Sequence, residues 1–106
     1  MSSIALALVV FPLPGPAAPL SAGTHTVKLK HDGHDREMLI RLPETYDASR
    51  KYPVIFGFHG AGGPMKGYHR LLAPLVKAKG VISVSPQGVS NARGTTGWNG
   101  FSGHRI

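Results

Sequence analysis

The central stretch of the chain is an apolar run that ends in a glycine-rich turn. Residues 54–58 read Val-Ile-Phe-Gly-Phe, and residues 59–63 read His-Gly-Ala-Gly-Gly. A short run of β-branched and aromatic residues between Pro53 and glycines is typical of a strand buried on both faces, as in a parallel sheet. We therefore expect a strand at 54–58, followed by a turn at the carboxyl edge of the sheet, where α/β proteins bind ligands.

Two further strands are expected before this run. Residues 24–30 alternate between polar and apolar side chains, which predicts a half-buried strand. Asp32-Gly33 is a strong hairpin signal, and residues 36–42 provide a second strand that Pro43 closes. These two strands should pair in the antiparallel direction.

A helix and a fourth strand are expected after the glycine turn. Within residues 66–79 the apolar side chains recur three and four positions apart, so they share one helical face; they are Tyr68, Leu71, Leu72, Leu75 and Val76. Pro74 should break, restart or kink this helix, and Gly80 is a suitable C-terminal stop. Residues 81–84 read as a short strand, and the chain from Gln87 onward reads as a long loop. The order β-β-β-α-β predicts an α/β protein whose last two strands are parallel.

Composition narrows the chemistry that the chain can perform. The 106 residues suit one small domain, and the absence of cysteine excludes disulfides, zinc-thiolate sites and thiol nucleophiles. The formal net charge is +7, but the basic side chains are scattered rather than gathered on one stripe, so we expect no nucleic-acid partner. His31 and His34 flank the hairpin turn with two aspartates, yet no further ligands are spaced to close a metal shell, so no metal is expected.

The first 22 residues are expected to be a signal peptide, followed by one domain at 23–106. Residues 4–11 are apolar but too few to span a bilayer, so no transmembrane segment is expected, and Leu20-Ser21-Ala22 is an acceptable cleavage site. This predicts a secreted or periplasmic protein. The alternative is a disordered or misassigned start, because the segment has no Lys or Arg ahead of its apolar core.

Several motifs in their order resemble the start of secreted α/β-hydrolase esterases of the polyhydroxybutyrate depolymerase and feruloyl esterase type. They lie between about residue 24 and residue 100 and comprise Arg41-Leu42-Pro43-x-x-Tyr46, Tyr52-Pro53-Val54-Ile55-Phe56, His59-Gly60-Ala61-Gly62-Gly63, Ser85-Pro86-Gln87-Gly88 and Gly97-Trp98-Asn99. The resemblance implies an incomplete α/β-hydrolase fold and a serine-type carboxylic ester hydrolase without a cofactor. The implied substrate is a polyester, a feruloyl-sugar ester or a short-chain ester.

The resemblance also implies roles for the residues of the glycine turn. The backbone N–H groups of Ala61 and Gly62 would form part of an oxyanion hole. His59, Gly60 and Gly63 would support the loop, with His59 as a brace rather than a general base. The alternative is a glycine turn that only connects a strand to a helix.

Trp98 and Asn99 follow in the last of the quoted motifs, and the resemblance places them at the substrate cleft. An equal alternative for Trp98 is a hydrophobic plug beneath a long loop.

The catalytic triad that such an esterase needs is not found in these residues. No G-x-S-x-G elbow occurs; the nearest approximations are 88–92, where no helix is expected to follow, and 100–104, where the second glycine comes one place early. No Asp or Glu follows Asp47, so the order Ser, Asp, His cannot be completed. We expect the N-terminal part of an esterase, inactive by itself, whose strand at 54–58 is left with an open edge and a tendency to aggregate.

Two other readings remain open. A small basic exported module could use the same turn to hold an anion or a polysaccharide without chemistry. A peptidase of the α/β-hydrolase type would share the same opening.

Overall fold

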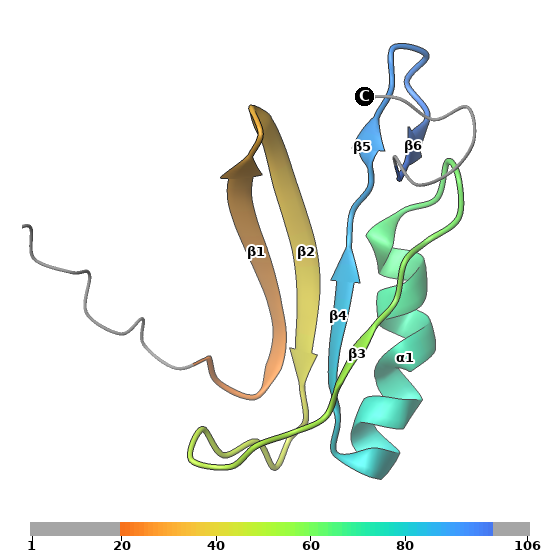
Figure 1. The fold of residues 1–106 in the computed structure, drawn as a ribbon. Coiled ribbons are helices and arrows are strands. Elements are labelled where there is room, and N and C mark those ends of the chain that lie inside the picture. The colour runs from red at the N-terminus through yellow and green to blue at the C-terminus, as the bar shows by residue number, and fades with distance from the viewer. Residues whose placement is uncertain (1–19, 99–106) are drawn as a thin grey trace, which may run out of the picture.

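A mixed sheet with one helix forms the body of the protein. The computed structural model describes residues 20–98; most of the expected signal peptide, together with Asn99, lies outside this range. The elements are β1 (Gly23–His31), β2 (His34–Leu42), β3 (Val54–Phe56), α1 (Met65–Lys79), β4 (Ile82–Pro86), β5 (Val89–Ser90) and β6 (Thr96–Gly97). Four strands lie in the order β1-β2-β4-β3, and β5 and β6 form a separate pair (Figure 1). The predicted α/β class, with a hairpin before a strand–helix–strand unit, is confirmed.

The β1–β2 hairpin follows from its turn residues. Asp32 and Gly33 have φ angles of 52° and 75°. Positive φ at both central positions is the requirement of the tight hairpin turn that Asp-Gly favours. The ladder then runs antiparallel from the His31–His34 pair to the Gly23–Leu42 pair. The hairpin prediction is confirmed, and β2 continues the sheet by pairing antiparallel with β4.

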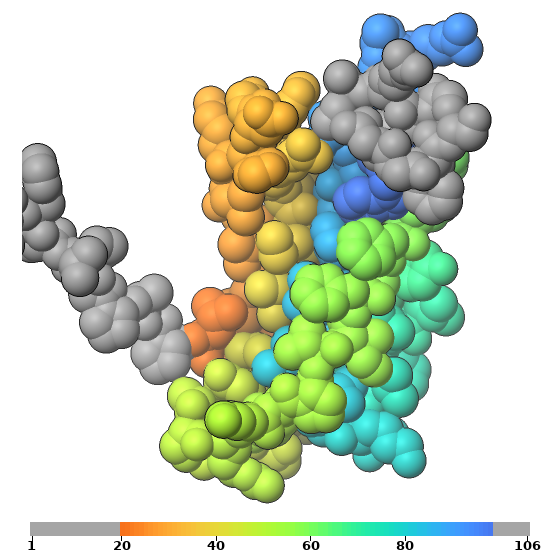
Figure 2. All heavy atoms as spheres, viewed as in Figure 1, coloured from red at the N-terminus to blue at the C-terminus, as the bar shows by residue number. Residues whose placement is uncertain are grey.

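Strand β3 lies at the edge of the sheet. It pairs in parallel with β4, and the Gly57 N–H donates to Val84 O at 2.9 Å. Val54 and Phe56 are 48% and 58% exposed, so the expected burial on both faces is wrong for the described chain. The reason is that α1 packs mainly on β4 and β2, and within residues 20–98 no strand or helix covers the face of β3 that carries Val54 and Phe56. Figure 2 shows the β3 segment, in light green, at the surface with no described element over it.

Helix α1 packs on one face of the sheet, against β4 and β2. Its buried residues are Met65, His69 and Val76, whereas Leu71 is 67% exposed. The buried face of α1 is therefore rotated from the predicted apolar face, because a histidine occupies the centre of the contact between the helix and the sheet. The helix runs through Pro74 without a break or restart.

Two glycines fit the helix to the sheet. A Cβ on Gly57 would lie 2.9 Å from the Tyr68 ring, so only glycine allows α1 to approach the end of β3 this closely. Gly80 ends the helix in the left-handed conformation, with φ 61° and ψ 39°, and its N–H donates to Val76 O at 3.0 Å. The predicted stop at Gly80 is confirmed.

The segment after Gln87 is more ordered than the predicted loop. Ser90 pairs with Thr96 to form the β5–β6 hairpin, and Asn91 Oδ1 accepts the N–H groups of Arg93 and Thr95 at 3.0 Å. Two-residue strands give too short a pattern for alternation to be seen in sequence. This hairpin brings Thr96 back towards the glycine turn.

A partly buried polar cluster lies between α1 and the β1–β2 hairpin. Arg41 Nη2 donates to His69 Nε2 at 2.8 Å, and Thr24 Oγ1 lies 3.1 Å from the same nitrogen. Because a guanidinium can only donate, Nε2 must be the unprotonated nitrogen of the ring. Burial lowers the pKa of His69 below its ordinary value of 6.5, and the charge of Arg41 lowers it further.

Acid should weaken the docking of α1 through His69. The pKa of this histidine is lower in the folded chain than in the unfolded chain, so the unfolded chain binds the proton first. The free energy of unfolding should therefore fall as the pH drops below about 6.5 and should not depend on His69 above that value. Urea titrations at a series of pH values would measure this, with His69→Gln as a control that keeps an acceptor for Arg41 but does not titrate. Equal pH dependence in both proteins would contradict the prediction.

The open edge of β3 should make the chain associate. Alternate residues of a parallel strand bond to the same neighbour, so the backbone groups of Val54 and Phe56 point to the free edge beside their exposed side chains. Phe56→Lys should slow concentration-dependent association several-fold, measured by light scattering, because an edge charge opposes strand pairing. Leu71→Lys makes the same change on the exposed side of α1 and should have less effect. Equal effects of the two variants would show that the edge is not responsible.

Candidate functional site

The glycine turn lies between the end of β3 and the start of α1. The Gly63 N–H donates to Gly60 O at 2.9 Å, which closes a four-residue turn. Gly62 has a φ of 76°, the value that the third position of a type II turn requires and that favours glycine. The turn thus stands at the carboxyl end of β3, next to the carboxyl end of β4 (Figure 1).

The ring of His59 joins the ends of β3 and β4. The side chain is only 4% exposed. The Gly88 N–H donates to Nε2 at 2.8 Å, so Nε2 is an acceptor, and Nδ1 donates to Gly60 O at 2.7 Å. Both ring nitrogens are engaged, which leaves no lone pair for a general base. The arrangement is that of a brace.

The β6 segment holds the other side of the turn. Thr96 O accepts the Gly62 N–H at 2.7 Å, and Thr96 Oγ1 donates to Gly63 O at 3.0 Å. Trp98 Nε1 donates to His59 O at 2.9 Å, and its ring meets the Phe58 ring edge-on at 5.0 Å between centroids. Trp98 is therefore anchored beside the turn.

The backbone donors of the turn fall into two classes. The Gly62 and Gly63 N–H groups are bonded to Thr96 O and Gly60 O. Within residues 20–98, no hydrogen bond from the N–H of Gly60 or Ala61 is found. Ala61 was expected as a donor from the motif; Gly62, the second expected donor, points to Thr96 instead, and Gly60 was expected only as loop support.

The accepting carbonyls set the direction of the two donors that have no partner within residues 20–98. A peptide unit is planar and trans, so its C=O and the following N–H point in opposite directions. Trp98 holds His59 O, which directs the Gly60 N–H to the opposite side. The His59 ring holds Gly60 O, which likewise directs the Ala61 N–H. The Gly60 and Ala61 N–H groups are thus oriented by bonds on the far side of their own peptide planes.

Gln87 is a member of this site that sequence reasoning missed. It stood in the quoted Ser-Pro-Gln-Gly motif without a role. Its Oε1 accepts the Met65 N–H at 2.8 Å, and its Nε2 lies 3.0 Å from His59 Nε2 and 3.3 Å from Gly63 O. These three partners lie 22 or more positions away, so no local pattern could have assigned them.

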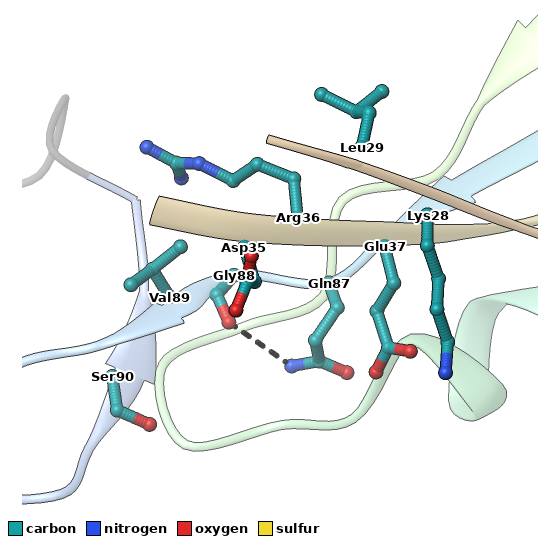
Figure 3. A pocket seen from close by; sticks show the side chains of 9 residues that line it. All are labelled: Lys28, Leu29, Asp35, Arg36, Glu37, Gln87, Gly88, Val89 and Ser90. Carbon is teal, nitrogen blue, oxygen red and sulfur yellow. Dashed lines mark hydrogen bonds between the residues drawn. The ribbon is translucent and has the colours of Figure 1, made fainter. Parts of the chain in front are cut away.

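A hollow of about 590 Å³ lies on another side of Gln87, where β2 and the segment after β4 separate. It is lined by Lys28, Leu29, Asp35, Arg36, Glu37, Gln87, Gly88, Val89 and Ser90. Figure 3 shows Lys28 and Glu37 pointing to one side of the strands, and Arg36 and Leu29 to the other. The hollow carries two acids and two bases and shares only Gln87 and Gly88 with the network of the turn, so it is distinct from the site predicted at 59–63.

Metal and membrane features were also sought. Residues 20–98 contain no group of three or more His, Asp or Glu side chains that could hold a metal ion. No helix in the same range is long and apolar enough to cross a membrane.

Comparison with known proteins gives one partial similarity. Over 30 residues the chain is 50% identical to a probable feruloyl esterase C of Aspergillus terreus (strain NIH 2624 / FGSC A1156). The matched part is 28% of this chain and only 11% of that protein. No protein-family model matches the chain. The similarity suggests a relation to esterases, and it covers too little of the relative to show more.

Removing the His59 ring should destabilise the chain. His59→Ala would leave the buried Gly88 N–H without an acceptor, which should cost about 1–3 kcal/mol of unfolding free energy. His31→Ala, at the exposed hairpin tip, is a matched control and should change it by less than about 0.5 kcal/mol. Urea denaturation would measure both. Equal losses would contradict the bracing role of His59.

Proposed function

We propose that this chain carries the oxyanion-binding turn of a serine-type carboxylic ester hydrolase. The observation that supports this most directly is the pair of outward N–H groups at Gly60 and Ala61, beside the carboxyl ends of two parallel strands. The partial similarity to a feruloyl esterase supports a relation to the same class of enzyme. The motif predicted a donor at Ala61, and the hydrogen bonds favour Gly60 over Gly62 as its companion.

The chemistry of such a turn follows from where charge develops. When a nucleophile attacks an ester carbon, the carbonyl oxygen gains negative charge, and donors already directed at that oxygen stabilise it. One such donor contributes about 10²–10³ in rate. The glycine at 60 has no side chain to obstruct an approaching oxygen. The bonds to His59 O and Gly60 O keep both donors oriented before the substrate arrives.

The remaining parts of the reaction are proposed for the whole protein. These 106 residues contain no G-x-S-x-G elbow and no carboxylate after Asp47. The nucleophile, its acid and its final histidine would come from further segments. The substrate would be a polyester, a feruloyl-sugar ester or a short-chain ester, and the apolar start of the chain would direct it to the periplasm or outside the cell.

A second candidate is an exported module that binds an anion without chemistry. It is favoured by the same two free N–H groups together with the net charge of +7. The continuation of the gene separates the two functions. A G-x-S-x-G elbow followed by Asp and His would support a hydrolase, of the esterase or the peptidase type. A stop codon with none of these would support the binding module.

The purified chain should not turn over esters. Loss of a triad nucleophile costs about 10⁶ in rate, which leaves an isolated oxyanion turn nearly inert. Hydrolysis of p-nitrophenyl butyrate should therefore equal the rate in buffer, measured by absorbance. Turnover that disappears in a Ser90→Ala or Ser102→Ala variant would show that a nucleophile is present after all.

The turn should nevertheless bind a tetrahedral oxyanion. In a titration with methylphosphonate at constant ionic strength, the amide signals of Gly60 and Ala61 should shift most, and the Gly62 signal should shift less because its N–H is bonded to Thr96 O. Two-dimensional NMR would measure these shifts, with sodium chloride as the control anion. Shifts confined to lysine and arginine residues would contradict the proposed function.

A further inference from the structure

We propose that Gln87 is the positioning residue of the turn at 60–63, acting on the oxyanion donors through His59. The inference rests on the proposed function, because it concerns how the same two N–H groups are held. Gln87 does not reach either N–H group itself. It connects the exit of β4 to the turn and to the first residue of α1, three parts of the chain that no other described side chain joins.

The orientation of the Gln87 amide is set by the start of α1. The N-cap residue Pro64 makes no side-chain hydrogen bond, and the first turn of the helix contains no acidic residue. The exposed N–H groups of a helix start need acceptors from elsewhere. Gln87 Oε1 accepts the Met65 N–H at 2.8 Å, and a flipped amide would instead present a donor to a donor.

This orientation directs the amide nitrogen of Gln87 at the brace. Nε2 lies 3.0 Å from His59 Nε2, 3.3 Å from Gly63 O and 3.4 Å from Gly88 O, and the contact with Gly88 O is drawn in Figure 3. The Gln87 amide thus joins the Gly88 N–H, which donates to the same ring nitrogen at 2.8 Å, and the two donors together favour the tautomer that carries its proton on Nδ1. That proton bonds to Gly60 O, whose peptide plane directs the Ala61 N–H. The path therefore runs from Gln87 through the His59 ring to the oxyanion donor.

A purely structural role would be to cap α1. Two variants separate this role from positioning. Gln87→Met keeps the size of the side chain but loses both the acceptor for the Met65 N–H and the donor to His59. Adding Pro64→Ser gives the helix a local cap, because serine at this position accepts the orphan N–H groups, while the donor to His59 stays absent. Pro64→Ser alone is the matched control and leaves Gln87 in place.

The experiment compares these proteins by three measurements. The temperature of thermal unfolding shows whether α1 is capped. The ¹⁵N shifts of the His59 ring show which tautomer it adopts. The methylphosphonate titration shows whether the Gly60 and Ala61 N–H groups still bind an oxyanion. Gln87→Met should lower the melting temperature and weaken methylphosphonate binding by about two- to tenfold, the range expected for one lost hydrogen bond. The double variant should regain melting temperature, while binding stays weak and the ring stays less fully in its Nδ1–H form.

The outcomes distinguish this inference from the proposed function. If the natural chain binds methylphosphonate and the double variant binds it equally well with an unchanged ring tautomer, Gln87 is only a helix cap and the inference is overturned. If Gln87→Met itself binds as the natural chain does, the inference is also overturned. If the natural chain shows no response at Gly60 and Ala61, the proposed function fails first and the inference fails with it.

Discussion

The geometry of the candidate site depends on one buried ring, whose two nitrogens both form hydrogen bonds. His59 lies between the exits of two parallel strands, and each of its nitrogens is bonded to backbone, Nδ1 to Gly60 O and Nε2 to the Gly88 N–H. A buried polar group without a partner costs more than a made hydrogen bond contributes, so both strand exits must keep their positions relative to the ring. The glycine turn and the Gln87 amide both bond to this ring, and the β5–β6 hairpin bonds to the turn through Thr96. Within residues 20–98, the Gly60 and Ala61 N–H groups are the donors of the turn that have no partner.

Local signals in the sequence predicted the parts of the fold that depend on local geometry. Asp32-Gly33 specifies its hairpin because both residues take positive φ, and Gly80 ends α1 for the same reason. Burial was predicted less well. The run at 54–58 has the composition of a strand buried on both faces, yet burial depends on which neighbours are present, and within residues 20–98 no strand or helix covers the face that carries Val54 and Phe56. The helix face was misjudged because hydropathy ranks Leu71 above His69, whereas His69 is the one that meets Arg41.

In the candidate site, too, the features set by local sequence were predicted and those set by distant contacts were not. A glycine-rich motif after an apolar strand was sufficient to locate the turn and to name Ala61. It could not show that Thr96 O takes the Gly62 N–H, because these residues are brought together by a hairpin of two-residue strands that leaves no periodic pattern. Nor could it show that Gln87 bonds to Met65, since one amide in sequence has no preferred partner. Contacts of this kind form only in the finished fold.

The hydrogen bonds that orient the turn do not involve the free edge of β3. The free edge of β3 belongs to Val54 and Phe56, whereas the partners of the turn lie at Gln87, Gly88, Thr96 and Trp98. These partners follow β4, which is paired on both sides, with β2 and with β3. Pairing of a further strand with the free edge would therefore add stability without supplying any bond that directs the Gly60 or Ala61 N–H. It follows that oxyanion geometry in this segment can be tested separately from catalysis, since the groups that set it are already present within residues 59–98.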